Sequence, residues 1–95
     1  MAVEKDSAVV VRSFAFKEAD RIVTFLTPTF GKVGVVARGS RKARSRLSAS
    51  LELFNIGELV FFQKPNRDLH NVNSFDVVES IGVQLRDHIA VAYAS

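Results

Sequence analysis

The sequence predicts an all-β fold, a five-stranded Greek-key barrel with a short connector helix and a C-terminal helix that begins the next domain. Three observations carry this prediction. Runs rich in β-branched residues recur along the chain, turn residues separate them at short intervals, and the hydrophobic period becomes helical only after Ser80. At 95 residues the chain is near the lower end of the size at which one domain builds a single core.

The first two strands are predicted at residues 8–14 and 21–27. The first run holds three successive valines, which favour a strand over a helix, and the β pattern resumes after a short charged interruption. Residues 27–32 are predicted to form a hairpin loop, because Pro28 fixes its φ angle and Gly31 accepts a positive one.

Residues 32–39 show the clearest alternation and are predicted to form the third strand. Val33, Val35 and Ala37 are expected to face the core. The opposite face is expected to be a small, partly apolar platform that is basic at both ends, which suits the close approach of a nucleic-acid backbone. Its members are Lys32, Gly34, Val36 and Arg38.

A basic connector follows at residues 40–50 and is expected to form a short helix around residues 42–47. The apolar stretch at residues 51–64 is predicted to form the fourth strand. Asn55 and Gly57 interrupt that stretch, and they indicate a bulge or a bend.

Residues 65–68 are a cluster of turn formers, and residues 69–78 are predicted to form the fifth strand. Val72, Phe75 and Val77 are its expected packing residues.

After Ser80 the apolar residues recur on one face of a helix, with Ser80 as its expected cap. We interpret residues 1–79 as the barrel domain and residues 80–95 as the start of a truncated helical domain. The alternative is a complete small protein whose last helix packs on the barrel. The apolar positions are Ile81, Leu85, Ile89 and Ala92.

The basic residues of the chain are strongly segregated. Residues 21–51 contain 31 positions without one acidic side chain and carry seven bases, so they contribute +7 to a chain of net charge +3. Repulsion within such a segment is costly unless an anion binds it, and phosphate is the first candidate. Five bases crowd into residues 38–46, namely Arg38, Arg41, Lys42, Arg44 and Arg46.

These bases predict binding to the phosphate backbone with little sequence preference. Arginine predominates, and its planar fork matches a phosphate with two hydrogen bonds. Phe30 is the ring that we expect to be best exposed for stacking on bases, and Arg67 lies in a turn that barrels of this kind use for contact. The predicted DNA-binding residues are Phe30, Lys32, Arg38, Arg41, Lys42, Arg44, Arg46 and Arg67.

Other functional classes lack the residues that they require. The chain has no cysteine and only two histidines, so no metal or other cofactor is expected, and no serine has histidine and acid partners in a catalytic arrangement. Glu18 and Asp20 share a face of an extended strand and could bind a cation, but a solvated charged loop is the favoured interpretation. We expect no enzyme. No signal peptide or apolar span is visible, so a soluble cytoplasmic protein is expected.

Several segments together resemble the RecO family of bacterial DNA repair and recombination mediators. The likeness covers about residues 8–80, and its most specific part is Val-Ala-Arg-Gly at residues 36–39, downstream of Asp20-Arg21 and Thr27-Pro28. The other matching segments are residues 8–12, 18–28, 45–47, 53–55 and 69–74.

The resemblance implies an oligonucleotide/oligosaccharide-binding (OB) fold followed by a longer helical domain, which in many members carries a cysteine zinc site that is absent here. It also implies binding of single- and double-stranded DNA, annealing of complementary strands, and RecA loading with RecR on strands coated by single-stranded-DNA-binding protein. A bacterial cytoplasmic, nucleoid-associated location follows. The alternative function is a protein-interaction module whose basic surface binds an acidic peptide of a partner.

Overall fold

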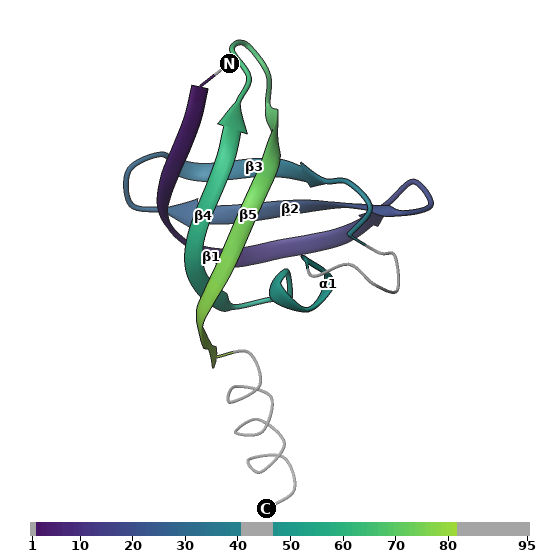
Figure 1. Cartoon of the computed structure of the whole chain (residues 1–95), viewed down its shortest axis with the longest axis vertical. Coiled ribbons are helices and arrows are strands. Elements are labelled where there is room, and N and C mark those ends of the chain that lie inside the picture. The colour runs from purple at the N-terminus through teal and green to yellow at the C-terminus, as the bar shows by residue number, and fades with distance from the viewer. Residues whose placement is uncertain (1, 41–46, 82–95) are drawn as a thin grey trace, which may run out of the picture.

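The computed structural model describes residues 2–40 and 47–81. Within these ranges five strands close into a barrel in the order β1-β2-β3-β5-β4, and the predicted all-β class is confirmed. Figure 1 shows β4 and β5 crossing over β2 and β3, with α1 near one end of the barrel. The elements are β1 (Ala2–Phe16), β2 (Asp20–Thr27), β3 (Gly31–Ala37), α1 (Leu47–Ser50), β4 (Asn55–Gln63) and β5 (Leu69–Ser80).

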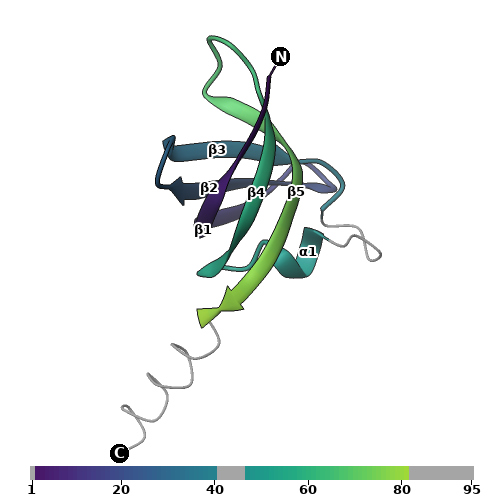
Figure 2. The same ribbon diagram turned by 60° about the vertical axis from the view of Figure 1, so that its left-hand side comes forward.

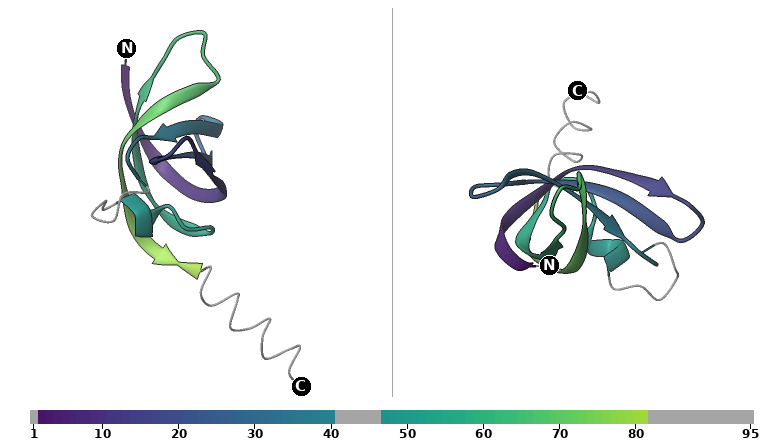
Figure 3. Two further views of the ribbon diagram at one scale, coloured as in Figure 1. Left: turned by 90° about the vertical axis from the view of Figure 1, so that its right-hand side faces the viewer. Right: turned by 90° about the horizontal axis from the view of Figure 1, so that it is seen from above.

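The strand order, the parallel pairing of β3 with β5 and the helix between β3 and β4 together make an OB-like barrel. The other strand pairs are antiparallel. The turn between β1 and β2 and the turn between β2 and β3 lie at opposite sides of the molecule (Figure 1), and the β1–β2 hairpin projects beyond the barrel (Figure 3).

Strand β1 is longer than the sequence predicted, because its first half pairs with β4. Residues from Ala2 to Val9 form this ladder, and Figure 2 shows the two strands side by side. The rest of β1 pairs with β2. The charged start of the chain was not expected to be a strand. Its charges are accommodated because side chains at the barrel surface stay in solvent, as in the 3.3 Å ion pair of Lys5 with Glu58.

The core lies inside the barrel and receives residues from every strand. Val33, Val35 and Ala37 are buried, as predicted. Phe25 and Phe75 pack at its centre with ring centroids 4.9 Å apart. The buried apolar residues are Ala8, Val10, Val23, Phe25, Val33, Val35, Ala37, Leu51, Leu59, Phe61 and Phe75.

Strand β4 begins at Asn55 rather than at residue 51, because the preceding residues form a turn in which Phe54 has a φ of 66°. The expected irregularity near Gly57 is confirmed as a register shift between Ile56 and Gly57 in the pairing with β5. Leu51 nevertheless reaches the core, where it is 1% exposed.

Two of the three expected packing residues of β5 contact the core. Phe75 is buried, and Val72 packs against the buried cluster. The prediction for Val77 was wrong, since this side chain is 39% exposed. Val77 lines a pocket between α1 and β5, which leaves part of its side chain open to solvent.

The predicted hairpin loop between β2 and β3 is confirmed, and Gly31 has the positive φ, 65°, that the turn requires. Within the described residues the connector contains the helix α1, and most of the segment predicted to be helical, residues 42–47, lies outside them. The predicted C-terminal helix lies outside them beyond Ile81. Within residues 2–40 and 47–81, no helix has the length and apolar character needed to cross a bilayer.

Candidate nucleic-acid interface

A β-bulge in β1 decides which of its side chains face solvent. Val10 is fully buried opposite β2, and the next residue of β1 paired with β2 is Arg12, so Val11 is the extra residue. The extra residue reverses the alternation of the strand. Arg12, Phe14 and Phe16 therefore lie on the outside of the barrel, opposite outward residues of β2.

The outward side chains of β1, β2 and β3 form rows, and we call this surface the outer face. Because paired residues of neighbouring strands share a face, the registers define each row. The first row is apolar. The second row, next to it, contains the cation Arg12, and the third row contains the cation Lys32. In order, the rows are Phe14, Ile22 and Val36; Arg12, Thr24 and Gly34; and Leu26 with Lys32.

The two predicted cations of β3 bracket the outer face. Lys32 is the second residue of the strand and Arg38 follows its last residue, and both are exposed. The two residues are six positions apart along the extended chain, which corresponds to about 20 Å. This length allows one extended nucleic-acid strand to contact both side chains.

The turn after β3 is held by side-chain hydrogen bonds. Asp20 Oδ1 accepts a hydrogen bond from the Gly39 backbone N–H at 2.8 Å, and Gly39 has a φ of 69°. Ser40 is fully buried and donates to the Ala37 carbonyl at 2.8 Å. The carboxylate of Asp20 therefore positions the turn from which the basic segment begins at Arg38.

The turn between β4 and β5 lies beside the outer face, because Leu69 at the start of β5 pairs with Gly34. Arg67 is exposed in this turn. The Lys64 N–H donates to His70 Nδ1 at 3.0 Å and closes the base of the turn. The structure therefore brings Arg67 to the same edge of the barrel as β3.

The sequence predicted that Phe30 would be the best exposed ring, but this prediction was wrong, because Phe14 and Phe54 are more exposed. Phe30 is half-buried and meets Phe61 edge-on, with the ring centroids 5.5 Å apart. Its backbone N–H donates to Thr27 Oγ1 at 3.0 Å, which holds the turn between β2 and β3 closed. Its contact with DNA stays a prediction.

The remaining predicted cations, Arg41, Lys42, Arg44 and Arg46, lie outside the described residues. Their part in DNA binding stays a prediction as well. Of the two acids that could bind a cation, Asp20 is engaged by the turn after β3. In the part of the chain that the structure describes, no group of three histidine or acidic side chains is placed to hold a metal ion.

Arg12 and Phe14 are the residues of the outer face that the sequence analysis missed. Both are exposed, Phe14 at 41%, and the Arg12 guanidinium carbon lies 5.2 Å from the ring centroid. A sequence signal was present, since a basic and an aromatic residue two positions apart share a face of a strand. Simple alternation, however, places both on the same face as the buried Val10.

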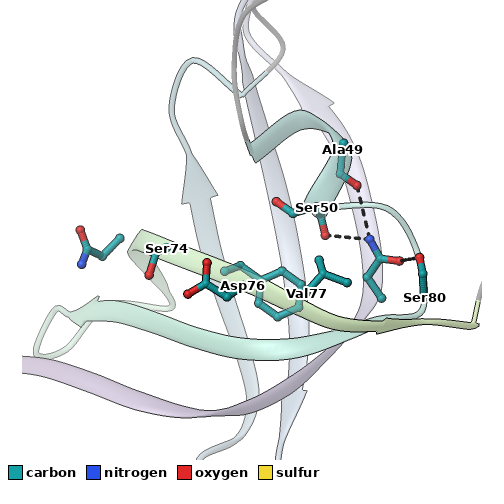
Figure 4. Close-up of a pocket in the computed structure, with 9 residues that line it drawn as sticks. Ala49, Ser50, Ser74, Asp76, Val77 and Ser80 are labelled. Carbon is teal, nitrogen blue, oxygen red and sulfur yellow. Dashed lines mark hydrogen bonds between the residues drawn. The ribbon is translucent and has the colours of Figure 1, made fainter.

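A pocket of 690 Å³ between α1 and β5 fits a phosphate poorly. Among the described residues that line it, Asp76 is the charged one, and a carboxylate repels an anion. The Asn55 side-chain amide donates to the carbonyls of Ala49 and Ser50 at 3.3 and 3.0 Å, and Ser80 donates to Asn55 (Figure 4). The pocket is thus a polar junction that joins α1 to the barrel.

Known proteins of one family are similar to this chain over most of its length. The family model described as "Recombination protein O N terminal" matches residues 1–81. A protein of Listeria monocytogenes serotype 4b (strain CLIP80459) named DNA repair protein RecO is 38% identical over 93 residues, which cover 98% of this chain and 36% of that protein.

Two other relatives carry the same name. The protein of Acetivibrio thermocellus is 35% identical over 91 residues, or 96% of this chain, and that of Clostridium novyi (strain NT) is 28% identical over 95 residues, or 100% of it. The chain spans 36% of the length of each of these relatives. The match over residues 1–81 shows that this chain belongs to the RecO N-terminal family of DNA repair and recombination proteins.

Proposed function

We propose that this chain binds DNA along its outer face, with basic side chains on the phosphates, and that it serves DNA repair and recombination in this way. The observation that carries the proposal is the arrangement of charge on β3. Lys32 and Arg38 are exposed at the two ends of the strand, and the apolar row through Val36 crosses between them. OB barrels bind oligonucleotides on this face.

The chemistry of this face suits the backbone of DNA rather than its sequence. Arginine and lysine neutralise phosphates on either single- or double-stranded DNA, and release of counterions supplies most of such an affinity. Few amide or acidic side chains on the face could discriminate base edges. The predicted residues of the connector, from Arg41 to Arg46, extend the same binding surface in this proposal.

The wider role in repair and recombination is inferred from the family, and it concerns the whole protein rather than this chain alone. Strand annealing and the loading of RecA with RecR, on strands coated by single-stranded-DNA-binding protein, are proposed for the whole protein. The chain matches 36% of its relatives' length. In this proposal the barrel contributes the contact with DNA and needs no catalytic step.

The test is the salt dependence of DNA affinity, measured by fluorescence anisotropy of a labelled single strand. If about four phosphates are contacted, log affinity falls against log salt with a slope near −3 for single strands. The double variant Lys32→Gln/Arg38→Gln is expected to flatten this slope by about 1.4, since each lost phosphate contact removes about 0.7. Both side chains are exposed, so the thermal stability should stay unchanged.

The control is Lys5→Gln, because Lys5 is also exposed but lies on the part of β1 that pairs with β4. This variant should keep the parent slope. Equal slopes for the parent and the double variant would contradict the proposal. An acidic peptide is added as a competitor. Tight binding of that peptide together with negligible binding of DNA would instead favour the protein-interaction alternative.

A further inference from the structure

Phe14 is an aromatic side chain that does not pack in the core of the barrel. The bulge at Val11 turns it away from the core, and 41% of it is exposed on the outer face. Exposure of part of the ring loses free energy that its burial would provide. A ring left on the surface inside a basic region therefore suggests a ligand that covers it.

Cations accompany this ring and the next one along the strand. The Arg12 guanidinium lies 5.2 Å from the centre of Phe14, and Lys17 Nζ lies 5.3 Å from the centre of Phe16. Each pair is close enough for a cation–π interaction. A nucleotide offers the complement of such a pair, since its base can stack on the ring while its phosphate contacts the cation.

No other phenylalanine within the described ranges combines the exposure of Phe14 with a cation over its ring. Phe25, Phe61 and Phe75 are buried in the core, and Phe30 packs edge-on against Phe61. Within residues 2–40 and 47–81, the rings with a cation over them are the two of β1, at Phe14 and Phe16.

We propose that Phe14 and Arg12 form a stacking site for an unpaired base, so that the preferred ligand of the outer face is a single strand. The bases of a duplex are already stacked on one another and cannot lie against a protein ring without being unpaired. The ring thus adds affinity for single strands that phosphate contacts alone do not supply. This inference rests on the proposed DNA binding.

Three labelled oligonucleotides of equal length separate stacking from phosphate binding: a normal single strand, a strand of abasic sites, and a blunt-ended duplex without unpaired bases. The parent chain is expected to bind the normal strand about 5- to 150-fold more tightly than the abasic strand, as stacking of one base contributes. Phe14→Leu should bind both strands with the affinity that the parent has for the abasic strand. The duplex should bind the parent and Phe14→Leu equally.

Phe54→Leu is the matched control, because Phe54 is 40% exposed but lies in the turn before β4. This variant should keep the preference for normal over abasic strands. Phe14→Trp provides a second measurement, since the chain has no other tryptophan. Its fluorescence should change on addition of the normal strand and remain unchanged with the abasic strand.

The outcomes distinguish the two proposals. Equal affinity of the parent for normal and abasic strands, or an unchanged signal of Phe14→Trp on saturation with the normal strand, overturns the stacking site and leaves phosphate binding intact. Loss of the preference in both Phe14→Leu and Phe54→Leu also overturns the assignment to Phe14. Failure to bind any of the three oligonucleotides overturns the proposed function, and the stacking site with it.

Discussion

At the scale of single residues, Gly57 shows how closely β4 and β5 approach each other. A methyl group at this position would lie 2.8 Å from the carbonyl carbon of Asp76 and 2.9 Å from Val77 Cα. Both are backbone atoms, which cannot rotate away as a side chain can. The adjoining register shift, where β5 has one residue more than β4, lies at the same place. Glycine is therefore required for the pairing of the two strands.

Gly57→Ala is expected to destabilise the barrel by about 1–3 kcal/mol, the usual cost of forcing extra atoms into a packed site. The free energy of unfolding from urea denaturation measures the effect. Gly34→Ala is the control, since the nearest atom there is the end of the Leu69 side chain at 3.2 Å, which can move. A Gly57→Ala variant as stable as the parent would show that β5 can retreat without cost.

At the scale of elements, one carboxylate joins β1 to the turn between β2 and β3. Asp6 Oδ2 accepts a hydrogen bond from the Thr29 N–H at 2.9 Å, and its Oδ1 accepts one from the Ser7 N–H at 2.9 Å. The bond from Thr29 is the main reason why the pKa of Asp6 lies below its ordinary value of 3.8. The charged form of the carboxylate therefore supports the folded barrel.

The stability contributed by Asp6 is expected to depend on pH with a defined sign. Because its pKa is lower in the folded state, the contribution is complete above 3.8 and disappears as the pH falls through the folded-state value. Asp6→Asn should therefore lower stability at neutral pH and lose this difference in acid. An NMR titration of the Asp6 carboxyl carbon with a midpoint at or above 3.8 would contradict this account.

At the scale of the whole molecule, the pairing of β3 with β5 closes the barrel and is its weakest strand pairing. We call this pairing the seam. Strands β3 and β5 pair in parallel over three residue pairs, from Gly34 with Leu69 to Val36 with Asn71. The antiparallel ladders are longer, with seven or eight pairs each. Parallel pairing is also slightly less stable per residue. The seam lies at the edge of the outer face, so opening it would disturb the proposed DNA-binding surface.

Amides of this seam are expected to exchange with solvent through partial opening, at a lower free energy than amides of the β1–β2 and β4–β5 ladders. Native-state hydrogen exchange at low denaturant measures these free energies residue by residue. A bound single strand that contacts both β3 and the turn before Leu69 should raise the protection of the seam. Seam amides that share the global free energy of unfolding would contradict the prediction.

Much of the barrel could be predicted from local patterns. The alternation of Val33, Val35 and Ala37 and the turn ending at Gly31 depend on neighbouring residues alone, and both are confirmed. The exposed positions of Lys32 and Arg38 followed from the same alternation. The extension of β1 to Ala2 could not be predicted, because it arises from pairing with β4, which is distant in sequence.

The sequence by itself determined the all-β class, the order of the strands along the chain and the segregation of basic residues, because each depends on side-chain type and short spacing. The tertiary structure alone decided which face of β1 is outside. Simple alternation puts Phe14 on the buried face of Val10, and the bulge at Val11 reverses this. That bulge is defined only by the pairing of β1 with β2, so the ring beside Arg12 becomes an outward side chain only when these two strands pair.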